Sequence, residues 1–287
     1  MSSHEARRSP RAESGFFYGY IVVVAAFFIM VGIFGLYYTF GVFFKPVLTE
    51  FGWTRAMTSG AFSLSAITHG LLGIAMGGLT DRFGPRVVMT LCGFLLGLGY
   101  LLMSQIGAIW QLYLFYGLII GVGMGGSFVP LMSTVARWFV KRRSMATGIV
   151  AAGIGVGALV APPAANWLIS TYDWRVSYII LGSIVLVIVI LAAQALRRDP
   201  AQLGQLPYGE NKREEQGVGL ETDGLSLREA VYTKQLWLVS GMFFCLGFCV
   251  FTIMVHIVLH AIGLGVPATS AAGILATIGG MSIVGRV

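Results

Sequence analysis

Ionisable side chains that interrupt long apolar runs are the first candidates for chemistry in this chain. Arg286, His69 and His256 each fall within such a run. An ionisable group is costly inside hydrocarbon unless it faces water or a partner. The guanidinium of Arg286 would suit a carboxylate, which it can bind through two parallel hydrogen bonds. The alternative for Arg286 is a buried structural pair or a side chain that extends to the membrane surface.

The first apolar run adds two tyrosines, Tyr38 and the adjacent Tyr37. A tyrosine offers a hydroxyl donor on an apolar body, which suits a small anion in a dry cavity. We expect Tyr38 to bind the ligand and regard Tyr37 as the weaker candidate. His69 has two interpretations, a structural hydrogen bond or a role in binding substrate or a proton.

His256 and His260 are spaced i, i+4 on one helix face, which they share with Cys245 and Cys249. At 1.5 Å per residue, Cys245 and His260 would lie about 22 Å apart, so the four cannot bind one ion. No metal site is therefore predicted. We interpret the face as a polar stripe towards a cavity, with His256 as a ligand for substrate or proton.

The composition places these residues in a membrane protein. Only 11% of the 287 residues are charged, 56% are hydrophobic, and the mean hydropathy is +0.82. A soluble domain has about a quarter charged residues, and a membrane-spanning helix needs about 20 apolar ones. The apolar runs predict an all-α membrane protein with spans near 17–44, 56–79, 87–104, 109–136, 146–170, 176–196 and 236–262, and an eighth from about 268.

Positive charge is distributed unequally between the two sides of these spans. The formal net charge is +7. Lysines and arginines gather in the N-terminal tail, after spans two and four, and between spans six and seven. Only Lys45, Arg55 and Arg175 fall on the other side. This bias predicts a cytoplasmic N-terminus in the cell membrane. It also accounts for the charge without a nucleic-acid partner.

The pattern divides the chain into four parts. We predict a cytoplasmic tail (1–16), a six-helix bundle (17–196), a cytoplasmic linker (197–235) and an incomplete second bundle (236–287). A faint repeat supports two similar halves, since Gly52 and Gly263 each precede a Thr-Ser pair by six residues. The eighth span is interrupted by the end of the sequence, so we expect the chain to be part of a longer protein.

The polar turn between spans two and three carries the most specific motif. It reads GGLTDRFGPR over residues 77–86. Gly84 followed by Pro85 would end one helix and begin the next. A polar turn that follows the charge bias is the simplest interpretation. The full spacing Gly77-x-Leu79-x-Asp81-Arg82-x-Gly84-x-Arg86, however, resembles the loop signature of the major facilitator superfamily.

This resemblance implies that family's fold, with a six-helix N-terminal bundle and here the first two helices of the C-terminal bundle, the second truncated. It implies that Gly77, Asp81, Arg82, Gly84 and Arg86 belong to a gating loop that does not touch substrate. Many proton-coupled members have an arginine in span four where this chain has Gly117. A coupling scheme that uses that arginine is therefore not carried over.

Two pairs of glycines at i, i+4 lie in spans four and five: Gly121 with Gly125, and Gly153 with Gly157. Small residues at this spacing let helix backbones approach closely. We expect helix packing here, and leave open a rocking motion of the same pair of helices.

Two segments resemble the branch of oxalate:formate antiporters and monocarboxylate transporters. In GLYYTFGVFFKPV, Tyr38 lies eight residues before Pro46, and SIVGRV ends the chain around Arg286. The resemblance implies that Arg286 binds a substrate carboxylate.

Together these features predict a secondary transporter that works by alternating access on a small organic anion, a mono- or dicarboxylate. We expect a monomer in the lipid bilayer, without cofactor and without enzymatic activity. No nucleotide-binding loop is present, so ion or substrate gradients would drive transport. Two alternatives remain open: a transporter of drugs, sugars or amino acids, and a membrane sensor or scaffold that does not transport.

Overall fold

The computed structural model describes residues 17–209, 229 and 231–285. The predicted tail (1–16), most of the predicted linker and Arg286 lie outside the described residues. The helices are α1 (Gly19–Tyr38), α2 (Phe40–Phe51), α3 (Arg55–Phe83), α4 (Pro85–Met103), α5 (Ile109–Leu112), η1 (Tyr113–Ile120), α6 (Gly121–Gly125), α7 (Val129–Trp138), α8 (Arg143–Thr171), α9 (Trp174–Ala195), η2 (Pro200–Leu203), α11 (Lys234–Gly263) and α12 (Ala268–Val284).

Within the described residues, 7 helical segments are long and apolar enough to cross a membrane. Two of them join several helices end to end: α1 with α2, and α5, η1, α6 and α7. The shorter apolar α12 follows the seventh. The seven complete predicted spans are confirmed, and the all-α fold with them. The first span extends to Phe51 because the helix continues through Pro46, which leaves Lys45 exposed and Val47 buried.

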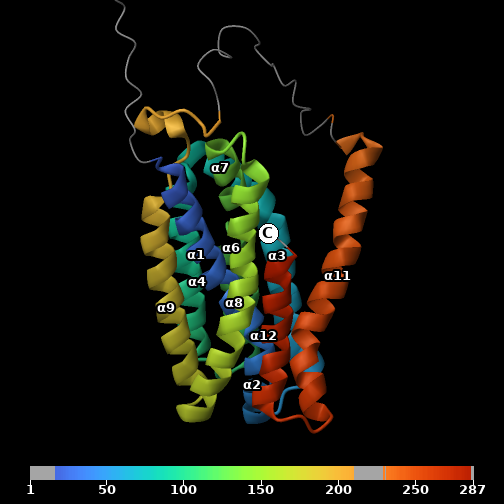
Figure 1. Cartoon of the computed structure of the whole chain (residues 1–287). Helices are drawn as coiled ribbons and strands as arrows, with labels where there is room; N and C mark the ends of the chain where they lie inside the picture. The colour runs from blue at the N-terminus through green and yellow to red at the C-terminus, as the bar shows by residue number, and fades with distance from the viewer. Residues whose placement is uncertain (1–16, 210–228, 230, 286–287) are drawn as a thin grey trace, which may run out of the picture.

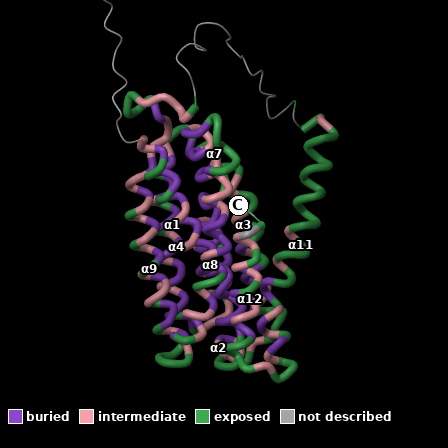
Figure 2. Tube along the Cα trace, viewed as in Figure 1, coloured by how far each residue is buried: buried purple, intermediate pink, exposed green. Residues whose placement is uncertain are grey.

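The helix α1 lies among the other helices of the six-span bundle (Figures 1 and 2). Its side chains are apolar on every face, and Ala26, Ile29, Met30 and Ile33 are completely buried. A helix that is hydrophobic all round is one that is buried. It packs against both α8 and α9, while Val24 and Phe28 on its outer face are 53% and 50% exposed.

Glycine allows α8 to approach α1 backbone to backbone. A Cβ added at Gly157 would lie 2.6 Å from the carbonyl oxygen of Val31 and 2.7 Å from the amide nitrogen of Gly35. Neither atom can move away without disturbing helix α1, so only glycine fits. This close contact gives the dispersion energy that holds helices together in lipid, where apolar side chains gain nothing by leaving the solvent.

The helices α11 and α12 cover a different side of the bundle. α12 packs closely along α8, where a Cβ at Gly279 would lie 2.7 Å from the amide nitrogen of Leu159. α11 contacts α2 and α12 near its Gly263 end and diverges from the bundle towards its Lys234 end (Figure 1).

The two turns that suggested a repeat are similar but not identical. Gly52 ends α2 with φ of 65°, and the Thr54 side chain caps α3 by accepting from the Met57 amide. Gly263, by contrast, is the last residue of α11, and the left-handed residue is Gly265 with φ of 88°. In the structure Gly52 therefore corresponds to Gly265, two residues after the Gly263 with which the sequence repeat pairs it.

The first residues of the predicted linker are folded against the bundle. The Tyr208 amide donates to the Trp138 carbonyl at 2.9 Å, and its carbonyl accepts from Val140 and Lys141. The indole of Trp138 donates to the Arg197 carbonyl at 3.0 Å. The turn between α7 and α8 is thus tied to the end of α9.

We predict that Gly157→Ala lowers the free energy of unfolding by about 1–3 kcal/mol, the usual cost of overpacking. The reason is the collision of the new methyl group with the α1 backbone. Thermal unfolding of purified protein in detergent would measure it.

The matched control is Gly241→Ala in α11, where nothing lies within 4 Å of the added Cβ. It should leave stability unchanged or slightly raised, because alanine is the better helix former. Equal effects of the two substitutions would contradict the close-contact account.

Candidate functional site

Two adjoining cavities lie between α3 and α11. The first has a volume of about 680 Å³ and is walled by α3 and α11, with single residues of α1 and α8 and the turn from α6 to α7. The second has about 540 Å³ and lies further along the same two helices. Phe243, Gly247 and Phe251 of α11 line both, so the two cavities adjoin along this helix.

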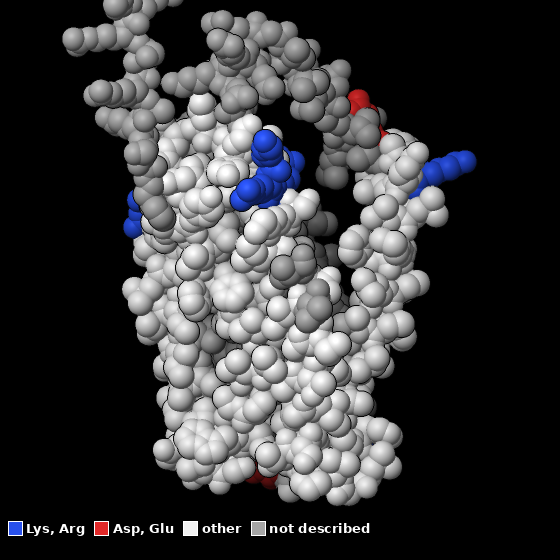
Figure 3. All heavy atoms as spheres, in the orientation of Figure 1, with Lys and Arg blue, Asp and Glu red and all other residues white. Residues whose placement is uncertain are grey.

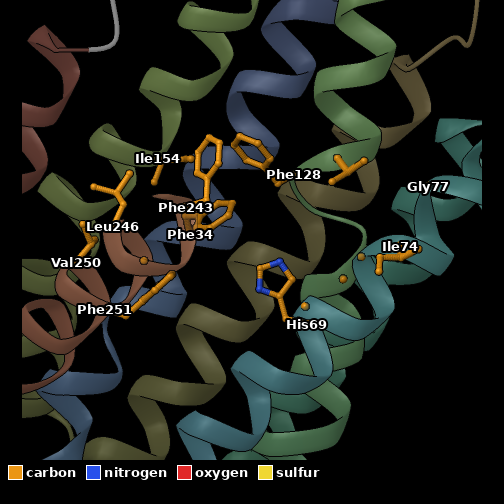
Figure 4. A pocket seen from close by; sticks show the side chains of 15 residues that line it. Phe34, His69, Ile74, Gly77, Phe128, Ile154, Phe243, Leu246, Val250 and Phe251 are labelled. Atoms are coloured by element: carbon orange, nitrogen blue, oxygen red, sulfur yellow. The ribbon is translucent and has the colours of Figure 1, made fainter. Parts of the chain in front are cut away.

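The first cavity is mostly aromatic and aliphatic, with one ionisable group. Figure 4 shows the imidazole of His69 pointing from α3 into this space, opposite Phe34, Phe243 and Phe251. His69 is partly buried. Among the described residues it makes no side-chain hydrogen bond, so the structural hydrogen bond considered from sequence is not seen there.

The second cavity is more polar. Ser59 and Ser63 of α3 face Thr252 and His256 of α11 across it. His260, one turn beyond His256, lines neither cavity. Sequence reasoning did not identify the serines or Thr252. Their spacing of four along each helix, in register with His256, was the available signal.

Tyr37 and Tyr38 are packed into the interior of the bundle. Both are buried and neither lines the two cavities. The Tyr37 ring packs against Phe62 at 4.8 Å and against Phe251 at 6.3 Å between centroids. Tyr37 is therefore separated from the second cavity by these two phenylalanines. The role of Tyr37 and Tyr38 in substrate binding, and that of Arg286, remains a prediction.

The residues of the predicted gating loop lie at the end of the bundle where α7 ends and α8 begins. Gly84 has φ of 83° and is the only residue between α3 and α4, with Pro85 as the first residue of α4. A glycine with positive φ followed by proline makes the turn that the sequence predicted. Gly77 lies one helical turn before Asp81 and lines the first cavity.

The charged residues of this loop pair within the bundle. Asp81 accepts from Arg137 at the end of α7, at 2.5 Å, and Arg137 also lies 3.8 Å from Asp199. The Arg82 guanidinium lies 5.3 Å above the Phe83 ring. Sequence reasoning missed Arg137 and Asp199 as partners, because they come from segments more than fifty residues away.

Arg86 fastens the start of α4 to the end of α9. Its Nε donates to Gln194 Oε1 at 2.7 Å, and Gln194 Nε2 donates in turn to Thr90 at 3.0 Å. The loop signature thus connects α3, α4, α7 and α9 at one end of the bundle.

A second polar cluster holds the opposite end. Glu50 at the end of α2 accepts from Arg175 and from the indole of Trp174 at the start of α9, both at 2.5 Å. Arg175 also donates to the Ile106 carbonyl at 3.2 Å and stacks on Trp174. This cluster joins α2, α9 and the turn after α4.

The four glycines predicted to pack helices lie at close helix contacts. A Cβ at Gly121 would lie 2.8 Å from the Thr68 Cβ, and one at Gly125 would lie 3.1 Å from the Leu72 Cβ, both on α3. On α8, a Cβ at Gly153 would lie 2.7 Å from the Phe27 carbonyl, and Gly157 meets α1 as described above.

The family model of the major facilitator superfamily matches residues 15–287. The chain belongs to this superfamily. It is 32% identical over 270 residues to monocarboxylate transporter 13 of Bos taurus, covering 94% of this chain and 60% of that protein. It is 29% identical over 257 residues to the oxalate:formate antiporter of Oxalobacter formigenes, covering 90% of this chain and 58% of that protein.

The fold also matches a solved structure. A bacterial homolog of the human lysosomal transporter Spinster, inward-facing and unoccupied, superposes with a TM-score of 0.71 at 19% identity. The match covers 93% of this chain and 61% of that one. This superfamily chain therefore spans about 60% of the length of the relatives that it matches.

We predict that a cysteine in place of His69 reacts rapidly with a charged thiol reagent, because the cavity admits water. The test uses a Cys245→Ala/Cys249→Ala background, since both cysteines are exposed while Cys92 is buried. Mass spectrometry of vesicle-embedded protein would follow the labelling.

Ile179→Cys on the outer face of α9 is the matched control, because that side chain is exposed but lines neither cavity. It should stay unlabelled beneath lipid. Equal labelling rates at the two positions would mean that the reagent reaches the cavity no faster than it reaches the lipid-facing surface. That result would contradict the prediction.

We predict that Asp81→Asn lowers the free energy of unfolding by less than about 1 kcal/mol, the ordinary value of a solvent-exposed ion pair. The Asp81 side chain is 60% exposed, so water screens the pair. Thermal unfolding would measure this, with transport assayed in parallel.

Arg137→Ala should have the larger effect, because it leaves Asp81 and Asp199 without their shared cation. A loss of several kcal/mol in Asp81→Asn would indicate that this carboxylate supports the fold and is not chiefly a gating group.

Proposed function

We propose that this protein is a secondary transporter that carries a small organic anion, a mono- or dicarboxylate, by alternating access. The observation that carries the proposal is the similarity to a monocarboxylate transporter and to an oxalate:formate antiporter over nine-tenths of the chain. Both relatives are named for carboxylates. The cavity between α3 and α11 supplies the place where such a substrate would bind.

The lining of the two cavities is consistent with an anion. No aspartate or glutamate lines either of them in the described part of the chain. An unpaired carboxylate in such an apolar space would be strongly unfavourable, so binding requires a nearby cation or several donors. We propose that Arg286 supplies the positive charge, with His69 and His256 as titratable partners and the hydroxyls of Ser59, Ser63 and Thr252 as donors.

Tyr38 and Tyr37 would join the site only if α1 or the wall formed by Phe62 and Phe251 moves. Alternating access supplies such a movement, since the two sides of the cavity belong to different bundles in this fold. The loop around Asp81 and the cluster around Glu50 and Arg175 lie at opposite ends of the bundle. We propose that the Asp81 end takes part in opening and closing while the glycine contacts of α8 with α1 guide the motion.

The charge distribution supports one direction of insertion. On the face shown in Figure 3, basic side chains gather at the end where α7 and α8 meet, and the long middle band carries no charge among the described residues. We propose that this end faces the cytoplasm and that the protein is a monomer in the cell membrane.

The test is uptake of labelled oxalate, formate, lactate and pyruvate into vesicles that hold the complete gene product. We expect saturable uptake, and a loss of about 10- to 100-fold in Arg286→Ala, the effect of removing charge-assisted hydrogen bonds worth about 1.5–3 kcal/mol. Arg286→Lys should recover part of it, because lysine keeps the charge and loses the bidentate geometry.

The histidines provide a matched pair. His256→Ala should weaken uptake, and His260→Ala should leave it unchanged, because only His256 lines a cavity. If carboxylate uptake is unchanged in Arg286→Ala, Arg286 is not the counter-ion of the substrate. Competition by neutral or cationic compounds instead would favour the drug, sugar or amino acid alternative, and ligand binding without flux would favour a sensor.

A further inference from the structure

Three consecutive basic residues lie exposed where α7 ends and α8 begins. They are Lys141, Arg142 and Arg143. Other arginines at this end of the bundle have acidic partners: Arg137 pairs with Asp81, and Arg198 Nε lies 3.2 Å from Asp199 Oδ2. In the part of the chain that the structure describes, no carboxylate pairs with any of the three. This turn therefore presents positive charge that no described acidic side chain neutralises.

The turn is held in place by the segment that follows α9. The Tyr208 carbonyl accepts from the Val140 and Lys141 amides, both at 3.1 Å. The Arg142 guanidinium lies 5.7 Å from the centroid of the Tyr208 ring, and this ring lies 5.8 Å from that of Phe139. An arginine that is already positioned loses less conformational freedom when it binds an anion.

Two hollows lie beside this turn on the outer side of α1, and Tyr20 lines both of them. The smaller hollow has a volume of about 60 Å³ and lies between α1 and the start of α8, where Arg142 lines it together with apolar side chains such as Phe139 and Met145. The larger has about 390 Å³ and lies between α1 and α9. The aromatic ring of Tyr20 thus links the basic turn to an apolar groove.

The larger hollow has the length and the character of a groove for a hydrocarbon chain. It extends from Tyr20 to Phe28, which is about 12 Å along α1 at 1.5 Å per residue. The hydrocarbon core of a bilayer is about 30 Å thick, so one leaflet is about 15 Å. Val24 and Leu191 line the groove from either side and are both exposed, so the groove opens towards the surrounding lipid.

We propose that this face binds an anionic phospholipid, with the headgroup phosphate at Lys141 and Arg142 and an acyl chain in the groove between α1 and α9. A guanidinium matches the geometry of a phosphate, and basic clusters at the cytoplasmic edge of membrane helices attract anionic lipids. A free phosphate would leave the groove empty, and a lipid without net charge would leave the basic residues unneutralised.

The lipid site is separate from the proposed substrate site. The residues that line the hollows at Tyr20 do not overlap with those that line the two cavities between α3 and α11. Lipid binding can therefore be measured without the substrate and does not depend on the proposed transport activity.

Native mass spectrometry of the complete gene product, titrated with phosphatidylglycerol in detergent, tests the proposal. We expect phosphatidylglycerol to bind more tightly than phosphatidylcholine, whose headgroup has no net charge. The variant Lys141→Gln/Arg142→Gln should bind phosphatidylglycerol about 30-fold more weakly, because each basic side chain near a membrane surface contributes about 1 kcal/mol.

The matched control is Lys45→Gln/Arg55→Gln, which removes the same charge from exposed residues at the opposite end of the bundle. Its affinity for phosphatidylglycerol should equal that of the wild type. Equal affinity of the wild type for the two lipids, or an equal loss in the two double variants, would overturn the proposal.

Ala192→Phe tests the groove, because the added ring would occupy the space between α1 and α9. Phosphatidylglycerol should bind about tenfold more weakly, the effect of displacing two methylene groups. Val187→Phe, exposed on the same helix and outside the groove, should bind as the wild type does. Leu191→Ser, at an exposed position of the groove, serves if Ala192→Phe does not fold.

Two further results would count against an anionic lipid at this face. Unchanged affinity in the groove variant would show that the acyl chain does not lie between α1 and α9. Displacement of phosphatidylglycerol by equimolar inorganic phosphate would show a site for a free anion. Either result would overturn the proposal.

Discussion

The exclusion of water from the bilayer interior is the constraint on which this structure depends. Backbone amides and carbonyls have no solvent partner there, so each long apolar segment has to be helical. Helix association then gains nothing from apolar burial and relies on close contact. Glycines supply that contact between α8 and α1 and between α6 and α3, where a single added methyl group would meet a backbone atom or a neighbouring side chain.

The same constraint moves charge to the ends of the bundle. Asp81, Arg137 and Asp199 form one cluster, and Glu50 with Arg175 forms another at the opposite end. Both clusters lie where water can share their hydration cost, so each joins several helices without placing an unpaired charge in lipid. The charged ends thus position helices whose middle sections are held by packing alone.

The polar side chains in the middle of the bundle lie either beside the cavities or in the packed interior. His69 and His256 line the space between α3 and α11, where a substrate could reach them. Tyr37, Ser65, Tyr100 and Tyr116 do not line this space and are buried inside the six-span bundle. Phe62 and Phe251 line the second cavity and pack against the Tyr37 ring.

The sequence by itself determined the spans, the polar turn at Gly84 and the superfamily, because hydropathy, turn chemistry and a spaced motif are local properties. It also identified His69 and His256, since an ionisable group in an apolar run is visible without a structure. It did not reveal that Arg137 is the partner of Asp81, or that neither Tyr37 nor Tyr38 lines a cavity in this structure. Pairing of distant segments and the direction of a side chain on an all-apolar helix such as α1 depend on which helices pack together. Only the tertiary structure decides that, because neighbouring positions on such a helix look alike in sequence until a partner covers one of them.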